Sequence, residues 1–494
     1  MSNLSTILRV STAAAALAIA AFPTSAQAQE ACDINGAAGV PSAAANSLEC
    51  GTTANATDVN TTAIGAQADA TDDDATAVGF NANATGFHSS AFGALSDAIG
   101  LGSTAIGWEA DAIGARSTAL GNSAKAIGDD TTALGRSATA MLAGSTAVGR
   151  LAMAAGAQST VFGNQAAALG TGGIAIGGNT DGGMFGALAT DNAGIAIGAD
   201  SESRGIGAVA LGSDGDGDGD GAVANGAGSV AVGQDATASG VNMIAIGNNA
   251  NAAPPLTGAM DDNIAIGANS NSTGTHSTAL GALADATGIG ATALGWEADA
   301  LANNATAVGN SAKATGVGST ALGRQSVANG TNSTAVGFGA SNGGFANSVA
   351  IGAQTTNTAA NQVAVGGQTA ATARTVTGVA AGVNAFDAVN VSQLNAASTA
   401  LATSIDTLFD LRSSDRKETR KGIAAAMAMA EAPMPSQAGG LGYMVRGSAY
   451  RGEYAVSAGV NYRLNTANPM AIGAGVSYSG DKNTGATVSL SGEF

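Results

Sequence analysis

STAIGWEADAIGAR, residues 103–116, is followed directly by STALGNSAKAIGDD, residues 117–130. Both stretches are 14 residues long, and both place Ala, a large apolar residue and Gly at the same positions. Glycine closes this triplet from Gly65 to Gly366, in steps of 14 apart from two insertions of seven residues, one of six and one step of 15. So regular a period indicates a solenoid, in which each repeat packs on its neighbours.

The length of the period indicates which kind of solenoid this is. Helical repeats need about 33–47 residues, whereas 14 residues suit one coil of two short β-strands and two turns. In Thr104-Ala105-Ile106, successive side chains point to opposite faces. Because the equivalent pair Ile174 and Ile176 is apolar, we assign the face of Thr104 and Ile106 to the interior of the coil. Ala105 is then outside, where so small a residue would let a neighbouring chain approach closely.

The two tryptophans of the chain lie in nearly identical settings. Trp108 is in IGWEADA, residues 106–112, and Trp296 is in LGWEADA, residues 294–300. A block of repeats has therefore been duplicated within the chain. An exposed tryptophan can serve as a binding anchor; the alternative is a turn residue that packs between chains.

Composition excludes several classes of protein. The 494 residues include 73 Gly and only 4% aromatic residues, too few large side chains for one compact core, yet 45% are apolar and 11% charged, which argues against disorder. The net charge is −18, and residues 29–371 hold 7 Lys/Arg against 27 Asp/Glu. So acidic a region argues against nucleic acid or anionic lipid as a partner. The repeats offer only isolated charges, so we expect no enzyme and no cofactor.

The first 28 residues have the pattern of a signal peptide. A weakly basic start is followed by an apolar run from Ala13 to Phe22 and by the cleavage pattern Ala26-Gln27-Ala28. The segment that follows, residues 29–58, contains the only cysteines, Cys32 and Cys50. An oxidising compartment favours a disulfide between them, although two free thiols fit the sequence as well.

Beyond Gly366 the repeat stops, and two other patterns follow. Leu394, Leu401, Ile405 and Leu408 have coiled-coil spacing, although a single amphipathic helix would also fit. From Gly440, apolar residues alternate in four stretches of about 11 residues, the length that crosses a bilayer at a tilt. Open sheet edges are not tolerated in lipid, so several chains would have to share one barrel; a soluble antiparallel sheet is the alternative. Such a barrel would carry at its interfaces the five tyrosines, Tyr443, Tyr450, Tyr454, Tyr462 and Tyr478.

Taken together, these segments resemble the trimeric autotransporter adhesins, the YadA-like family of type V secretion. NSVAIGAQT (347–355) is similar to the head repeats of that family, and GVAAGVNAFDAVNVSQL (378–394) is similar to its neck. KGIAAAMAMAEAPMPS (421–436), YRGEYAVSAGVNYRLN (450–465) and the terminal Phe494 resemble its membrane anchor.

The resemblance implies an all-β-dominated architecture in several parts. The head is a left-handed parallel β-roll over residues 59–371, followed by a neck at 372–394, a short coiled-coil stalk at 395–421 and an anchor at 422–494. Three chains contribute four strands each to a twelve-stranded barrel, and the outer-membrane assembly machinery reads Phe494. The neck residues implied by the resemblance are Asp387, Ala388, Val389, Asn390, Gln393 and Leu394.

Two further motifs are candidate ligand sites. The family associates NSVAIG with collagen binding; here it occurs once, as Asn347, Ser348, Val349, Ala350, Ile351 and Gly352, and one copy does not support a collagen assignment. SDGDGDGDG, residues 213–221, places Asp214, Asp216 and Asp218 as in the opening of a calcium loop. Because the twelfth position is Asn225 rather than Glu, a solvated acidic loop is the alternative.

We therefore expect a homotrimeric adhesin on the outer membrane, with its head outside the cell and a ligand that the sequence does not identify. Matrix, cells, abiotic surfaces and other copies of the protein all remain open as targets. One rival is a coat or ice-binding solenoid, suggested by threonine ladders such as Thr104, Thr118, Thr132 and Thr146; inward-pointing threonines would deprive it of a surface. The other rival is a solenoid enzyme, which would need clustered acids or a metal.

Overall fold

The computed structural model describes residues 32–34, 45–180, 182–254, 262–367, 369–429 and 431–493. The predicted signal peptide and Phe494 lie outside these ranges. The chain divides into two compact units, one ending at Arg374 and the other beginning at Thr375.

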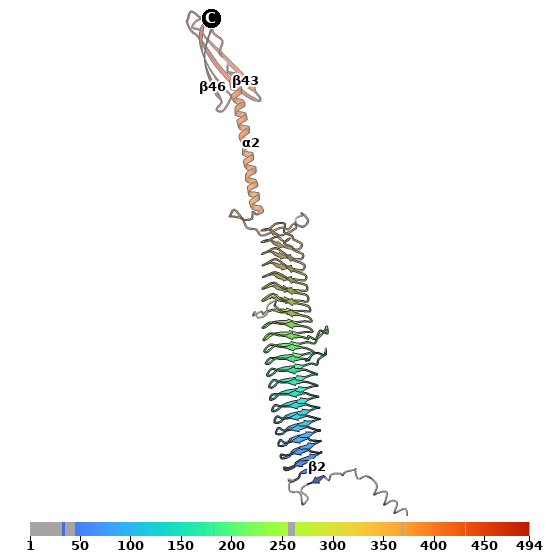
Figure 1. Ribbon diagram of the computed structural model, residues 1–494. Coiled ribbons are helices and arrows are strands. Elements are labelled where there is room, and N and C mark those ends of the chain that lie inside the picture. Colours follow the sequence, from blue (N-terminus) through green and yellow to red (C-terminus); the bar gives the residue numbers. More distant parts are fainter. Residues whose placement is uncertain are drawn as a thin grey trace, which may run out of the picture. The chain divides into compact units, whose positions relative to one another are not determined.

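The first unit is a parallel β-solenoid (Figure 1). Each coil has one three-residue strand, such as β10 (Thr104–Ile106), and one two-residue strand, such as β11 (Asp111–Ala112). Strand β10 pairs in parallel with β8 (Ser90–Phe92) and β12 (Thr118–Leu120), while β11 pairs with β9 (Asp97–Ala98) and β13 (Lys125–Ala126). These pairings place equivalent residues of successive repeats side by side.

Two ladders of strands therefore run the length of the solenoid. The first ladder extends from β2 (Leu48–Cys50) to β42 (Val363–Ala364), and the second from β3 (Asn55–Ala56) to β39 (Val327–Ala328). At the N-terminal end, β1 (Asp33–Ile34) pairs antiparallel with β2. The parallel solenoid predicted from the 14-residue period is confirmed.

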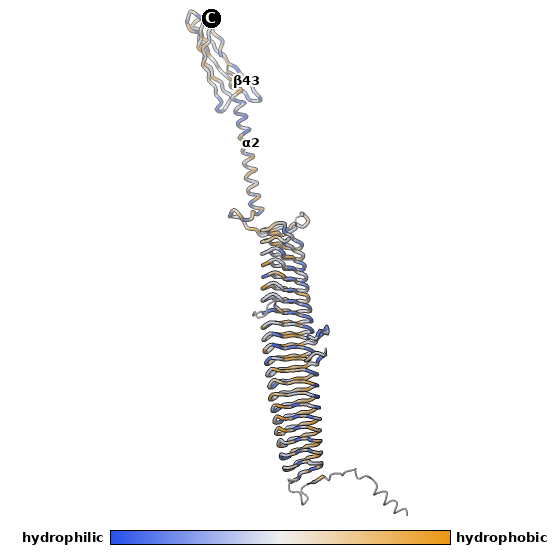
Figure 2. Tube along the Cα trace, in the orientation of Figure 1, coloured by the Kyte–Doolittle hydropathy of each residue, from blue (hydrophilic) through white to orange (hydrophobic). Residues whose placement is uncertain are grey.

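The assignment of inside and outside is wrong. Ala105 is 0% exposed, and so are Ala110 and Ala112 on the opposite side of the same coil, whereas Ile106 is 37% exposed. The two strands of a coil lie so close together that only methyl-sized side chains fit between them, and the large apolar residues point outward. Figure 2 shows these hydrophobic positions recurring from coil to coil. The same arrangement puts the threonine ladder on the outer face.

Glycine at the corner of each coil is a steric requirement. Gly107 has a φ of +133°, and a Cβ on it would lie 2.4 Å from the carbonyl oxygen of Gly121 in the next coil. Any side chain would therefore push two coils apart, in a backbone conformation that other residues rarely adopt. This contact explains why the glycine recurs at the period of the coil.

The insertions fall on different turns. Residues 178–186 lie between β20 (Ile174–Ile176) and β21 (Leu188–Ala189), and residues 213–221 lie between β24 (Val209–Leu211) and β25 (Val223–Ala224). Both are on the turn that leads from the first ladder to the second, and their described parts project from one side of the solenoid (Figure 1). The third insertion falls on the return turn, between β29 (Asn251–Ala252) and β30 (Ile264–Ile266).

The second unit joins one long helix to an antiparallel sheet. Helix α2 (Val391–Ala428) runs through the predicted stalk and into the predicted anchor without a break. The sheet consists of β43 (Leu441–Tyr450), β44 (Glu453–Arg463), β45 (Met470–Tyr478) and β46 (Thr484–Gly492), in sequence order. Among the described residues, no helix has the length and apolar character needed to cross a membrane.

The narrow interior leads to a test on β15 (Thr139–Ala140), where Ala140 is 0% exposed and Thr139 points outward. We expect Ala140→Leu to destabilise its coil by roughly 1–3 kcal/mol, because overpacking forces the strands apart. Thr139→Met is the matched control, since Met153 occupies the same position in the next coil. Hydrogen exchange should show faster opening of the coils around residue 140 in the first variant alone; equal exchange in both would contradict the assignment.

Candidate functional site

The sheet of the second unit has two chemically different faces. On β44, Ala455, Ser457 and Asn461 are buried, whereas Tyr454 and Val456 are exposed. The predicted alternation of faces is therefore present. The outer face carries an exposed apolar stripe that also includes Tyr443, Val445, Val460, Tyr462, Ile472, Val476, Tyr478 and Val488. An apolar surface of this extent indicates contact with lipid or with another protein.

The inner face holds the end of α2 through its polar residues. Ser457 Oγ donates to the carbonyl of Ala428 at 2.6 Å, and Asn461 Nδ2 donates to that of Ala432 at 2.9 Å. The last carbonyls of a helix have no partner within the helix, so these side chains supply it. The sequence analysis missed this role, although polar residues alternating with an apolar stripe were the available signal.

Small residues let the helix approach the sheet. Ala424, Ala425 and Ala428 pack against Ala455, and Tyr450 lies beside this cluster, half-buried. Tyr450 therefore differs from the other four tyrosines, which are exposed on the outer face. The prediction that all five tyrosines belong to one interfacial girdle is wrong for Tyr450, because its place in the strand turns it toward the helix.

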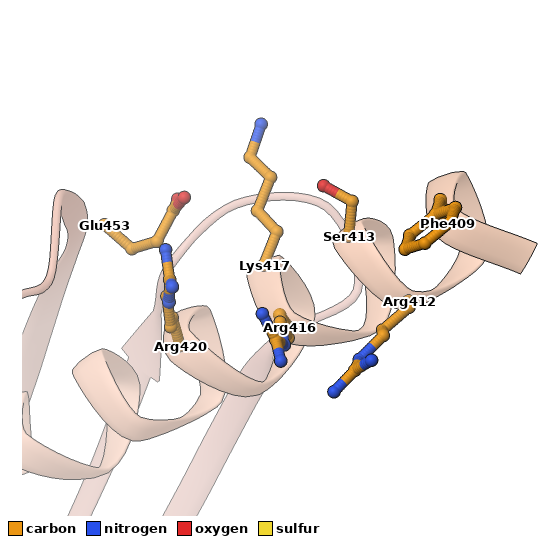
Figure 3. Close-up of a pocket in the computed structure, with 7 residues that line it drawn as sticks. All are labelled: Phe409, Arg412, Ser413, Arg416, Lys417, Arg420 and Glu453. Carbon is orange, nitrogen blue, oxygen red and sulfur yellow. The ribbon is translucent and has the colours of Figure 1, made fainter. Parts of the chain in front are cut away.

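A basic cleft lies where α2 meets the sheet (Figure 3). Arg412, Arg416 and Arg420 follow one another along the helix, and Glu453 of β44 lies beside Arg420. Just beyond them, Lys421 pairs with Asp481 in the turn between β45 and β46. Positive charge is therefore concentrated at this end of the sheet.

The neck residues fasten a loop to the start of α2. The Asp387 carboxylate accepts hydrogen bonds from the backbone N–H groups of Asn384 and Val383, at 2.8 and 2.9 Å, and these bonds hold its pKa below the usual range. Gln393 donates to the carbonyl of Gly382 and accepts from its N–H, both at 2.9 Å, and forms a capping box with Asn390. The apolar neck residues are left exposed in the single chain: Phe386, Val389 and Leu394.

The two tryptophans occupy equivalent positions on the head surface. Trp108 is 49% exposed and Trp296 is 47% exposed. Beside the first, the Ser123 hydroxyl lies 3.3 Å from Glu109, and Lys125 pairs with Asp111 at 2.8 Å. The second setting repeats these contacts, with Ser311 and Glu297 at 3.2 Å and Lys313 and Asp299 at 2.5 Å.

One carboxylate in each setting is held at an unfavourable position. The pKa of Asp97 is raised, first by burial and then by the neighbouring charge of Asp111. The pKa of Asp285 is raised by burial, and Asp299 acts in the same direction. Parallel stacking of coils causes this, because it places like side chains one strand spacing apart.

NSVAIG is only partly available to a ligand. Ser348 and Ala350 are 0% exposed, and the Ser348 hydroxyl donates to the carbonyl of Phe345 at 2.6 Å. Their prediction as ligand-contacting residues is therefore wrong, because both point into the coil. The residues of this motif that reach the outer surface are Asn347, Val349 and Ile351, with Gly352 at the corner.

The acidic loop is organised by its own backbone. Asp214 accepts hydrogen bonds from the N–H groups of Gly217, Asp216 and Gly219, which lower the pKa of its carboxyl. Carboxylate oxygens of Asp214, Asp216 and Asp218 lie within 4.8 Å of one another. That spacing is compatible with one cation, and calcium binding remains a prediction.

At the N-terminal end of the solenoid, Cys32 and Cys50 form a disulfide. Cys50 ends β2, the first strand of the long ladder, and β1 begins just after Cys32. The bond therefore ties the preceding segment to the first coil.

Comparisons with known proteins fit this geometry. A family profile described as the YadA head domain repeat matches residues 51–68, 56–82, 84–110, 112–138, 126–152, 143–166, 154–180, 224–250, 264–284, 286–312 and 314–340. A second, described as the coiled stalk of trimeric autotransporter adhesin, matches residues 375–417. The crystal structure of the collagen-binding domain of Yersinia adhesin YadA is 28% identical, with 39% of this chain and 83% of that chain covered and a TM-score of 0.20. No curated protein sequence matches the chain.

Head and stalk profiles together cover more than half of the sequence. The chain belongs to the YadA-like trimeric autotransporter adhesins. Members of this family are structural and adhesive proteins.

The raised pKa values of Asp97 and Asp285 predict a pH dependence. Folding raises the affinity of each carboxyl for its proton, so stability falls as the pH rises through the unfolded-state pKa to the folded-state pKa, and stays reduced at pH 7. The double variant Asp97→Asn and Asp285→Asn should therefore melt at a higher temperature than the wild type at pH 7. The difference should vanish below about pH 3.

Thermal denaturation of the full chain across this pH range measures the effect. Asp191→Asn, in an exposed turn, is the control and should leave the melting temperature unchanged. A double variant that melts like the wild type at pH 7 would show that the stacked carboxylates carry no penalty.

Proposed function

We propose that three copies of this chain form an outer-membrane adhesin, with a barrel of twelve strands that encloses the three helices. The observation that carries this proposal is the pairing of an apolar outer face with a polar inner face that already holds a helix. In this unit, β43 and β46 each pair with one neighbour only. Joining β46 of one chain to β43 of the next would satisfy both edges, as lipid requires.

In the head, we propose that the exposed apolar face of the first ladder is the surface between chains. Large side chains point outward there in nearly every coil, for example Ile106, Leu120 and Leu134. A continuous apolar face of this length is costly in water. Three heads that meet along it would bury the surface that the narrow interior cannot hold.

Export and anchoring follow from the ends of the chain. Residues 1–28 would direct secretion, and Phe494 would be read by the barrel-assembly machinery; both calls rest on the family resemblance and the sequence. The neck and the exposed seam of α2 would pass the three-fold arrangement from head to anchor. The head would then stand outside the cell, close to the membrane.

We propose adhesion as the function of the displayed head, with a surface ligand among matrix, cell, abiotic or self contacts. Three chains repeat the same outer surface, so weak contacts would add up through multivalency. The matching YadA domain is described as collagen-binding. Here NSVAIG occurs once and two of its residues are buried, so collagen is not our choice of ligand.

One observation favours the rival reading of an ice-binding or coat solenoid. Thr104, Thr118, Thr132 and Thr146 lie outward, in register along the first ladder. The argument that buried threonines exclude ice binding therefore fails. In our proposal the neighbouring chains cover this ladder, and thermal hysteresis by the intact protein would favour the rival instead.

The shared barrel predicts a heat-resistant trimer. We expect full-length protein, extracted from outer membranes in mild detergent, to migrate at three times the chain mass of 46.8 kDa less its signal peptide. Strong heating should convert it to single chains, because each sheet is completed only by its neighbours. A single-chain mass before heating, or absence from the outer-membrane fraction, would overturn the proposal.

A further inference from the structure

The duplicated block is unevenly preserved between its two copies. Residues 93–98, 107–112 and 121–126 cover the turn from the first ladder to the second, together with the second strand, in three successive coils. Compared with residues 281–286, 295–300 and 309–314, they differ only at Ser96, which is Ala284 in the second copy. Both of these residues are fully buried. Every outward-facing residue of this edge is therefore identical in the two copies.

The opposite turn of the same coils has diverged. Ile99 is replaced by Thr287, Arg116 by Asn304, and Asp129 by Val317. The copies have thus had time to change where change is harmless. Nor does the solenoid require tryptophan at its position, because Ala66, Phe80 and Arg136 occupy the equivalent position of other coils. Folding alone does not account for the preserved edge.

Packing between chains does not account for it either. The insertions at 178–186 and 213–221 project from the same turn as the tryptophans, in coils that lie between them. Loops of this size would hold a neighbouring head away from the edge. The chain-to-chain surface proposed above is the face of the first ladder, so this edge stays open to solvent in the trimer.

We propose that Trp108 and Trp296 are the centres of two equivalent binding sites for a neutral saccharide, on the edge defined by these preserved residues. The inference rests on the proposed display of the head as an adhesin, and it names the class of ligand. Nearly half of each indole's residue surface is accessible. A flat apolar ring of this kind can stack on the C–H face of a sugar, while placed polar groups fix its orientation.

The polar groups around each indole suit hydroxyl groups better than a charged partner. Glu109, Asp111 and Lys125 are already engaged, through Ser123 and through the ion pair. Donors and acceptors therefore alternate across adjacent coils with most of the charge balanced locally. A polycation would have to displace Lys125, and a polyanion would meet Asp97 and Glu109. Sugar hydroxyls can donate and accept without breaking the existing pairs.

The two sites are matched in direction and spacing. Strands β10 and β34 (Thr292–Leu294) are separated by twelve coils, or about 60 Å at one strand spacing per coil. Both indoles lie on the same turn of a rigid solenoid. A long polymer lying along the head could reach both sites at once, and the three chains would multiply the contacts.

Because Trp108 and Trp296 are the only tryptophans, indole fluorescence reports these sites directly. The full-length trimer in mild detergent is titrated with cellohexaose, chitohexaose and mannohexaose, with polylysine as the charged probe. We expect a saturable change in emission with at least one hexasaccharide. Trp108→Phe and Trp296→Phe should each keep about half of the amplitude, since the two sites are equivalent.

Retention on the immobilised saccharide separates binding from folding. We expect the double variant Trp108→Ala and Trp296→Ala to lose at least about tenfold in retention, as anchor residues do. Phe80→Ala, at an equivalent exposed turn outside the preserved block, should bind like the wild type. Both variants should keep the heat-resistant trimer.

Three results would overturn the inference. They are no indole response to any of the hexasaccharides, a response to polylysine alone, and loss of the trimer in the double tryptophan variant, which would place the indoles between chains. A wild-type protein that is not trimeric would instead reject the proposed function on which the inference rests.

Discussion

The interior of each coil is only wide enough for methyl groups. Ala105, Ala110 and Ala112 fill it from both sides, and a glycine at the corner lets the next coil lie at strand distance. Parallel pairing between coils then satisfies the backbone, as where the Gly121 N–H donates to the carbonyl of Ile106 at 2.8 Å. Everything larger than a methyl group has to point outward, and the outer surface of the head follows from that constraint.

That outer surface leaves the single chain incomplete. Large apolar side chains cover one ladder of the head, the neck exposes Phe386 and Leu394, and the sheet of the second unit exposes valines and tyrosines. All three parts have an apolar face without a partner in the chain itself. A three-fold assembly supplies partners for all of them, and lipid supplies one for the outer face of the sheet. The charged and aromatic residues of the turns are then free to determine what the head binds.

Much of this architecture was predictable from sequence, because it depends on period. The 14-residue repeat predicted the parallel solenoid, and alternation from Gly440 predicted the two faces of the four strands. Alternation alone cannot say which face is inside, however, and hydrophobicity suggested the wrong one: Ile106 is more apolar than Ala105, but only Ala105 fits. Contacts that depend on three-dimensional register were equally out of reach, such as Asn461 with the carbonyl of Ala432 or the burial of Ser348 within NSVAIG.

The most direct test of the central claim is the accessibility of the outward apolar face in the assembled protein. Leu120→Cys reports on that face, and Asn122→Cys reports on the neighbouring exposed turn. In intact trimers we expect a maleimide to label Asn122→Cys rapidly and to label Leu120→Cys only after heating separates the chains. Equal, rapid labelling of both cysteines in the intact protein would mean that the apolar face is open to water, and the account of the head as one third of a shared structure would be wrong.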